Sequence, residues 1–304
     1  MRIRMGRLVA SAVVVGAVVS GCGSGPSQVD SAVILGQDSI SLTQMQDQLR
    51  TALGRTDMVQ RITQQGGTTE QISRDVVTAA VMHQLLERAA RTEGITVTEA
   101  QVAAETTALG GTEAVLGRTL FDEENLHDAV WDRLAATELG RKYADRLSVI
   151  VDVALTTTQA EAGAKARTVA AGGPAAEAVF DDRNTAARNQ VLRVGQDPTL
   201  GATAAFGTPT GQVVAFEPSP GQAVWAVMRV TQRSTDAPPS EPSVVSSTDS
   251  DSLAAIGQRL VQPLSDQLAV AVNPRYGVWD PVQMRVVAPE ERGGVLLPVQ
   301  TGRG

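Results

Sequence analysis

The chain has few residues of the kinds that build disulfides, metal sites and ligand-stacking surfaces. Its 304 residues include one Cys, two His, four Phe, three Trp and two Tyr. A single cysteine excludes an internal disulfide. His83 and His127 have no cysteine partner and fall short of a stable tetrahedral site, so we expect no metal and no cofactor. The core must consist mainly of Ala, Val and Leu, and surfaces that stack sugars or bases are poorly supplied.

Positive charge is also scarce, with 26 basic against 33 acidic residues and a net charge of −7. Beyond the N-terminal arginines there is no Lys/Arg cluster to displace phosphate counterions, so nucleic acid is an unsuitable partner. The stretch GTPTGQ lacks the ending of a phosphate-binding loop, and no serine lies in a Gly-x-Ser-x-Gly elbow. The sequence therefore gives little support to catalysis.

The N-terminus has the pattern of a secretory signal over residues 1–21. Three arginines precede an apolar run, residues 8–21, that is too short to span a bilayer comfortably. The run ends in Val-Ser-Gly before Cys22, an order that resembles the lipobox of bacterial lipoproteins. That resemblance implies that Cys22 is lipidated and anchors the chain at the extracytoplasmic face of the cell membrane. The alternative is a chance cysteine in an ordinary secretion signal.

The rest of the chain divides by composition and hydrophobic period. Helical spacing of apolar residues and Ser/Thr caps recur as far as Leu147, and alternation typical of a strand begins at Val149. A Pro-rich polar stretch then separates an α+β region from a last apolar helix, in which Pro263 predicts a kink. The expected segments are a flexible tether over 22–30, a helical lobe over 31–148, an α+β insert over 149–233, a linker over 234–252, a C-terminal helix and extended segment over 253–289, and a loose tail over 290–304.

This order resembles the SurA/PrsA type of extracytoplasmic chaperone. The stretches that carry the resemblance are ILGQDSISLTQMQDQL, FGTPTGQVVAFEPSPGQAVWAVMRVTQR and VNPRYGVWD, and Phe206, Gly211, Val230 and Arg233 match the end of a parvulin-type domain. The resemblance implies a mainly α fold with an α+β insert, in which a discontinuous helical chaperone lobe accompanies a parvulin-like domain. We expect residues 253–288 to return to the N-terminal helices and not to pack on the insert.

The insert departs from the parvulin family at its catalytic positions. A catalytic parvulin pocket uses a pair of histidines on adjacent strands, but both histidines of this chain lie in the helical lobe. The corresponding strand positions hold Asp152 and Ala226. The resemblance therefore implies a degenerate parvulin-like domain, no catalytic residues and no prolyl isomerase activity.

The predicted function is a membrane-anchored chaperone, or holdase, whose partners are unfolded or exported polypeptides. Flexible methionines adapt to varied apolar partners, so we expect client binding at Met45, Leu49, Met58 and Met82. A structural or scaffolding cell-envelope lipoprotein that docks one folded partner with the same lobe is the alternative. A solute-binding lipoprotein fits less well, because such proteins carry larger doubly wound lobes.

Overall fold

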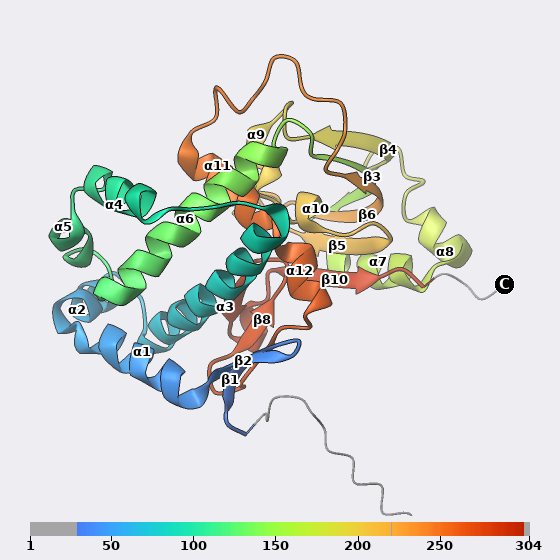
Figure 1. Cartoon of the computed structure of the whole chain (residues 1–304). Helices are drawn as coiled ribbons and strands as arrows, with labels where there is room; N and C mark the ends of the chain where they lie inside the picture. Colours follow the sequence, from blue (N-terminus) through green and yellow to red (C-terminus); the bar gives the residue numbers. More distant parts are fainter. Residues whose placement is uncertain (1–28, 220, 301–304) are drawn as a thin grey trace, which may run out of the picture.

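A computed structural model describes residues 29–219 and 221–300 of the chain, which form a helical lobe beside a five-stranded sheet (Figure 1). The predicted signal, Cys22 and most of the predicted tether lie outside the described residues. Within the described ranges, no helix is both long and apolar enough to cross a membrane.

The helical lobe begins with a β-hairpin, and polar caps set the starts of its helices. Ser41, Thr68, Thr98 and Asp122 each accept a hydrogen bond from the backbone N–H three residues further on, as the sequence predicts for the first three. Gly94 ends the longest helix in the left-handed conformation, with φ of 66°. The elements are β1 (Ser31–Leu35), β2 (Asp38–Ser41), α1 (Leu42–Gly54), α2 (Thr56–Gln64), α3 (Thr69–Glu93), α4 (Glu99–Ala108), α5 (Thr112–Leu116) and α6 (Glu123–Tyr143).

The insert is an antiparallel sheet with one helix packed along a face. The sheet order is β10-β5-β6-β3-β4, and α7 buries its small residues Ala162 and Ala166 against this sheet beside Val213 and Val227. The opposite face carries Val214 and other apolar residues of a separate core. The elements of the insert are β3 (Ser148–Thr156), α7 (Gln159–Ala171), α8 (Gly173–Ala178), β4 (Ala186–Arg193), α9 (Pro198–Gly201), α10 (Ala204–Gly207), β5 (Gln212–Phe216) and β6 (Trp225–Ser234).

The C-terminal segment contributes strands to both the helical lobe and the insert, which we call the two bodies. Its β7 pairs with β1 of the helical lobe, whereas its β10 pairs with β5 of the insert. The elements are α11 (Ser250–Leu260), α12 (Gln262–Gln267), β7 (Ala271–Val272), β8 (Val278–Asp280), β9 (Arg285–Val287), a 3-10 turn (Pro289–Glu291) and β10 (Gly294–Pro298). The predicted break at Pro263 is present, because α11 ends at Leu260 and α12 carries this proline in its first turn.

The expectation of a loose tail is wrong for residues 294–298. These residues form β10 in full register with β5, and Val295 and Leu297 pack against the α7 core. A strand of five residues has too few alternations for a clear period-two signal. Its partner β5 would otherwise be an edge strand, and an edge presents unpaired donors and acceptors to any chain nearby.

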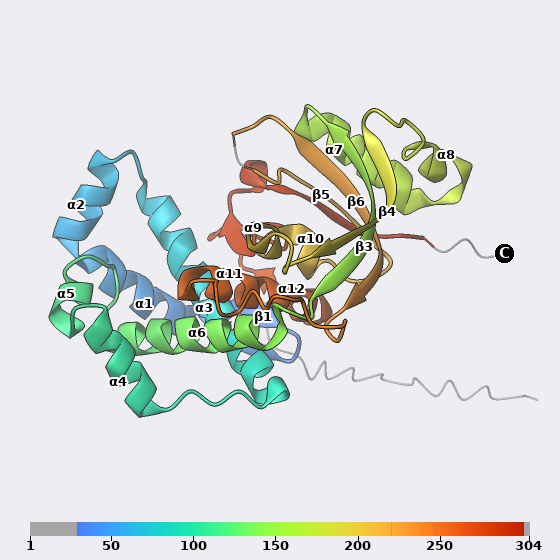
Figure 2. The ribbon, with the colours of Figure 1, turned by 90° about the horizontal axis from the view of Figure 1, so that it is seen from above.

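The helix α11 lies between α6 and the sheet of the insert (Figure 2). Leu253 and Ile256 belong to the same core cluster as Phe206 and Val214 of the insert. The expectation that the returning segment packs on the helical lobe is therefore incomplete, and its exclusion of the insert is wrong. The physical reason is that α11 is apolar on two sides, so it buries one side on each body.

Glycines allow α6 and α11 to approach until their backbones touch. A Cβ atom placed on Gly257 would lie 1.8 Å from the carbonyl oxygen of Ala136, and one placed on Gly140 would lie 2.0 Å from that of Leu253. No side chain fits in either gap. The close contact between α6 and α11 therefore requires glycine at both positions, because only the hydrogen atom of a glycine fits there.

The stretch between β6 and α11, where the sequence predicts a linker, has no helix or strand and is docked on the end of α6. The carboxylate of Asp145 accepts hydrogen bonds from the backbone N–H of Val244 at 2.8 Å and from the hydroxyl of Ser243 at 2.5 Å. Val244 is buried in the core that α11 shares with the insert. The linker therefore follows a fixed path.

Candidate functional site

A cleft of about 630 Å³ opens in the helical lobe between α1, α2, α3, α6 and the loop that precedes α6. Its apolar surface comes from all of these segments, since each amphipathic helix turns part of its apolar stripe toward the gap. The apolar lining residues are Ile40, Ala52, Met58, Ile62, Val76, Ala79, Ala80, Leu120, Phe121 and Ala129.

Amide side chains form much of the polar lining of the cleft. Gln44, Gln48, Gln65 and Gln84 line it together with Asn125. In the described part of the chain, the side chains of the four glutamines make no hydrogen bond, whereas Asn125 donates to Asp122. Each free amide offers both donors and an acceptor. The lining can therefore pair with a peptide backbone whatever its sequence.

A histidine–aspartate pair joins α3 to α6 at the cleft. Nδ1 of His83 lies 2.8 Å from Oδ1 of Asp132, and the ring of Trp131 meets the imidazole edge to face at 5.9 Å. The hydrogen bond to Asp132 raises the pKa of His83 above its ordinary value, against the opposing effect of burial. Burial raises the pKa of Asp132. The pKa values of both partners are therefore raised above their ordinary values.

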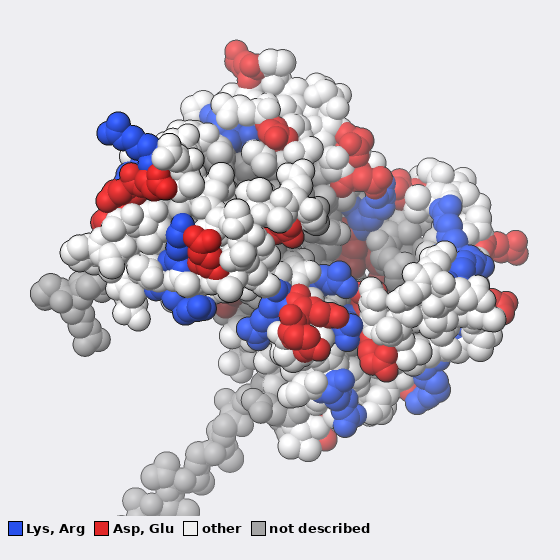
Figure 3. All heavy atoms as spheres, turned by 180° about the vertical axis from the view of Figure 1, so that it is seen from behind, with Lys and Arg blue, Asp and Glu red and all other residues white. Residues whose placement is uncertain are grey.

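Two arginines lie at the edge of the cleft without a carboxylate partner. Within residues 29–219 and 221–300, Arg61 has no ion pair, and Arg118 donates only to the carbonyl oxygen of Leu109 at 2.7 Å. Elsewhere, cations and anions are interspersed over the face shown in Figure 3, with no extended region of one sign.

A second cavity of about 400 Å³ adjoins the cleft. The two share Asp75 and Ala79 of α3 and Ala129 and Asp132 of α6 as lining residues. We call these four residues the waist. Beyond the waist, the second cavity is lined by Thr78, Met82, Leu86, Arg133, Ala202, Ala255, Gln258, Arg259, Gln283 and Met284. The cleft and the second cavity are therefore adjacent spaces that share part of their lining.

The structure separates the four residues predicted to bind clients. Met58 lines the cleft and Met82 lines the second cavity. Met45 and Leu49 are buried in the core beneath α1 and line neither the cleft nor the second cavity, whereas Met58, although also buried, borders the cleft. Sequence reasoning missed the glutamines and the His83–Asp132 pair. A signal was available for Gln44 and Gln48, because they recur one turn apart on α1 beside its apolar stripe.

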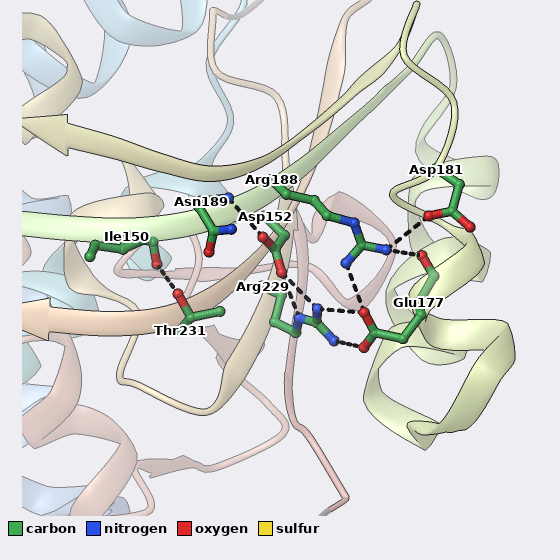
Figure 4. Close-up of polar contacts among 8 residues, drawn as sticks. All are labelled: Ile150, Asp152, Glu177, Asp181, Arg188, Asn189, Arg229 and Thr231. Atoms are coloured by element: carbon green, nitrogen blue, oxygen red, sulfur yellow. Dashed lines mark hydrogen bonds and ion pairs between the residues drawn. The ribbon is translucent and has the colours of Figure 1, made fainter.

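The insert holds Asp152 in a network of ion pairs (Figure 4). The Asp152 carboxylate accepts from Nη2 of Arg229 at 2.6 Å and from the backbone N–H of Asn189 at 2.9 Å. Asn189 has a φ of 53° opposite an irregularity in the β3–β4 pairing. The buried carboxylate thus holds the irregular part of the neighbouring strand β4 and the guanidinium of Arg229.

The network extends from the sheet to α8. Glu177 binds Arg229 at 2.5 Å and Arg188 at 2.7 Å, and these hydrogen bonds lower its pKa to about 2. Both guanidinium groups lie over the ring of Phe180, at 5.1 Å for Arg229 and 5.6 Å for Arg188. The cations and anions satisfy one another, so this site fixes α8 on the sheet.

Ala226, the other position that corresponds to a parvulin histidine, faces the opposite side of the sheet. It is fully buried in the core that contains Phe206 and Ile256, whereas Asp152 opposes Arg229 on the α8 side. The two positions therefore do not converge on one pocket. In the described part of the chain, no group of three or more His, Cys, Asp or Glu residues is placed to hold a metal.

Comparison with known proteins identifies the N-terminal region. Residues 2–110 match the SurA-like N-terminal domain family. No curated protein matches the chain. The crystal structure of the foldase protein PrsA from Lactococcus lactis aligns with 80% of this chain and 95% of that chain, at 12% sequence identity and a TM-score of 0.24. An alignment at that TM-score does not define a common fold. The family match confirms the predicted resemblance to a SurA-like N-terminal domain for residues 2–110, and the structure confirms a mainly α fold with an α+β part.

Proposed function

We propose that the protein is a membrane-anchored extracytoplasmic chaperone that holds unfolded exported polypeptides in the cleft of its helical lobe. The observation that carries this proposal is the combination of apolar walls with four glutamines that have no hydrogen-bond partner among the described residues. An unfolded chain offers the complement, namely apolar side chains and an unpaired backbone. The SurA-like N-terminal domain, which includes α1 to α4, contributes most of this surface.

Weak and reversible binding is expected from such a cleft. A buried apolar side chain contributes about 1.5–3 kcal/mol, and ordering each client side chain costs roughly 0.5–1.5 kcal/mol. A few anchors at Met58, Ile62 and Phe121 therefore leave a small net gain. Release without an energy source is compatible with that gain, and a holdase needs such release.

The proposal excludes prolyl isomerisation by the insert. Two observations support this. Asp152 forms an ion pair with Arg229, and Ala226 is buried in the core that the insert shares with α11. The insert contains no histidine in its sequence between residues 149 and 233. A proline-limited refolding reaction should therefore keep its uncatalysed time of tens to hundreds of seconds when this protein is added.

The membrane anchor in the proposal rests on Cys22 and the lipobox-like residues before it. A lipid on Cys22 would attach the tether a few residues before β1. Clients emerging from the membrane would then meet the cleft at high local concentration.

A light-scattering assay with a chemically unfolded client tests the function. Near-stoichiometric protein should suppress aggregation, and Ile62→Asp should weaken the suppression because it places a charge on an apolar wall of the cleft. Val191→Asp is the matched control. Val191 is 52% exposed on β4, the edge strand of the insert, and does not line the cleft. If both variants suppress client aggregation equally, the client binds outside the cleft. Absence of suppression by the wild type would reject the holdase and favour a scaffold for one folded partner.

A further inference from the structure

The second cavity contains an arginine whose donors are only partly used. Nε of Arg259 donates to the carbonyl oxygen of Ala202 at 3.0 Å, and Nη1 donates to the carbonyl oxygen of Val282 at 2.9 Å and to Oε1 of Gln262 at 2.8 Å. These bonds fix the guanidinium between the insert, α12 and the C-terminal segment. The donors of Nη2 have no partner among the described residues.

The charge of Arg259 also lacks a direct counter-ion. No carboxylate within residues 29–219 and 221–300 forms an ion pair with it, although Asp280 lies near enough to favour its charged form. Burial lowers the pKa of Arg259 to about 10, so the group is still charged at neutral pH. By contrast, Arg133, which borders the same cavity, is paired with Glu105 and Asp251.

The walls beside Arg259 are largely apolar. Met82 and Leu86 of α3 and Met284 of the C-terminal segment line the cavity with Ala202 and Ala255. A guanidinium with a free nitrogen suits a carboxylate, to which it can donate charge-assisted hydrogen bonds. The flexible thioethers suit an apolar side chain of variable shape. A ligand that satisfies the cavity therefore carries a carboxylate and an apolar group close together.

The C-terminal residue of a polypeptide has this combination when its side chain is apolar. In an internal Asp or Glu the carboxylate is part of the side chain, so the same residue has no apolar side chain to pack against the apolar walls. The four residues of the waist line both the cleft and the second cavity, so the two spaces lie next to each other along α3 and α6. A client chain held in the cleft is therefore close to the second cavity that contains Arg259.

We propose that the second cavity binds the C-terminal carboxylate of a client polypeptide at Arg259, with the apolar side chain of the last client residue against Met82, Leu86 and Met284. This inference rests on the proposed holdase function and names the part of the client that the cavity selects. The cleft binds the client backbone without regard to sequence, and the second cavity adds recognition of a free chain end.

Three peptides of otherwise identical sequence test the inference on the wild-type protein. One ends in Leu with a free carboxylate, the second ends in Leu carboxamide, and the third ends in Glu carboxamide. Fluorescence anisotropy with an N-terminal dye gives their dissociation constants at low salt. The free carboxylate should bind about tenfold or more tightly than either amide, as expected for a hydrogen bond to a charged group.

Two variants assign the preference to Arg259. Arg259→Gln should reduce the preference for the free carboxylate to near unity, and Arg50→Gln should retain it because Arg50 is exposed on α1 and lines neither the cleft nor the second cavity. Circular dichroism and thermal unfolding check that each variant is folded. The wild-type comparison of peptides stands whether or not Arg259→Gln folds.

The other outcomes separate this inference from the proposed function. Equal affinity for the first two peptides overturns the carboxylate site but leaves the holdase intact. Equal affinity for the first and third peptides assigns the cavity to acidic side chains and overturns the choice of the chain end. If no peptide binds while aggregation is still suppressed, the carboxylate site is rejected alone. If neither binding nor suppression occurs, both proposals fail.

Discussion

Replacing Gly257 by Ala tests whether contact between the α6 and α11 backbones holds the two bodies together. In a helix interior, Gly→Ala ordinarily stabilises by about 1 kcal/mol, because Ala has the higher helix propensity. At Gly257 the added Cβ would lie 1.8 Å from the carbonyl oxygen of Ala136, so the helices must separate by more than an ångström to reach ordinary van der Waals contact. We therefore expect the sign to reverse.

The magnitude follows from what that separation disrupts. Overpacking of a well-packed core costs typically about 1–3 kcal/mol, and here the obstacle is backbone, which gives less than a side chain. The loosened contact also reaches Leu253 and Ile256, which bury α11 against the insert. A net loss of about 2 kcal/mol corresponds to a fall in Tm of roughly 4 °C or more for a protein of this size.

Gly163→Ala is the matched control for that substitution. Gly163 is also within a helix, α7, but a Cβ there meets only Arg167 at 3.5 Å and Val295 at 3.8 Å, which is ordinary contact. Differential scanning calorimetry of the two variants should give Tm changes of opposite sign. A Gly257→Ala variant as stable as the wild type would show that α6 and α11 do not touch as described, and would refute the reasoning.

Three further predictions concern the anchor, the cleft and the last strand. Cys22→Ala should abolish lipidation and leave the protein in the aqueous phase of a detergent partition; an unmodified Cys22 in the membrane-extracted wild type, seen by intact mass, would contradict the anchor. NMR titration should place the pKa of His83 above its ordinary value of about 6.5, and Asp132→Asn should lower it while the pKa of His127, raised by Glu99, stays unchanged. Because the folded-state pKa of His83 is raised, its contribution to stability is full below pH 6.5 and is lost as pH rises through the folded value; a His83 pKa that does not respond to Asp132→Asn would reject the pairing. Deletion of residues 294–304 should lower the Tm of the insert, since β10 covers the edge of β5, and unchanged unfolding would mean that the strand is dispensable.

Local signals in the sequence predict the elements and much of their order. The caps Ser41, Thr68 and Thr98 act on backbone groups three residues away, so their effect is readable without knowledge of the fold. The alternation that begins at Val149 likewise reflects the two faces of β3. The match of residues 2–110 to the SurA-like domain family agrees with the resemblance seen in the opening helix.

The details of the site depend on packing that no local pattern encodes. Met45 and Met58 both belong to the apolar stripe of a helix. Met45 of α1 packs in the core, whereas Met58 of α2 lines the cleft. Arg259 looks like an ordinary exposed position of an amphipathic helix, and only the docking of α11 between two bodies withdraws it from solvent. Both Asp152 and Ala226 stand where the resemblance places a parvulin histidine. Only the pairing register of β3 and β6 shows that the two side chains lie on opposite faces of the sheet.

The division of the C-terminal segment between the two sheets has a consequence for biosynthesis. β7 joins β1, which is made first, and β10 joins β5, so neither sheet is complete until the last residues are available. Synthesis proceeds at about 5–20 residues per second, and pairing of distant strands is slow. For many seconds the nascent chain therefore has its own apolar surfaces uncovered. During that time this protein has the same need for protection that we propose it meets in others.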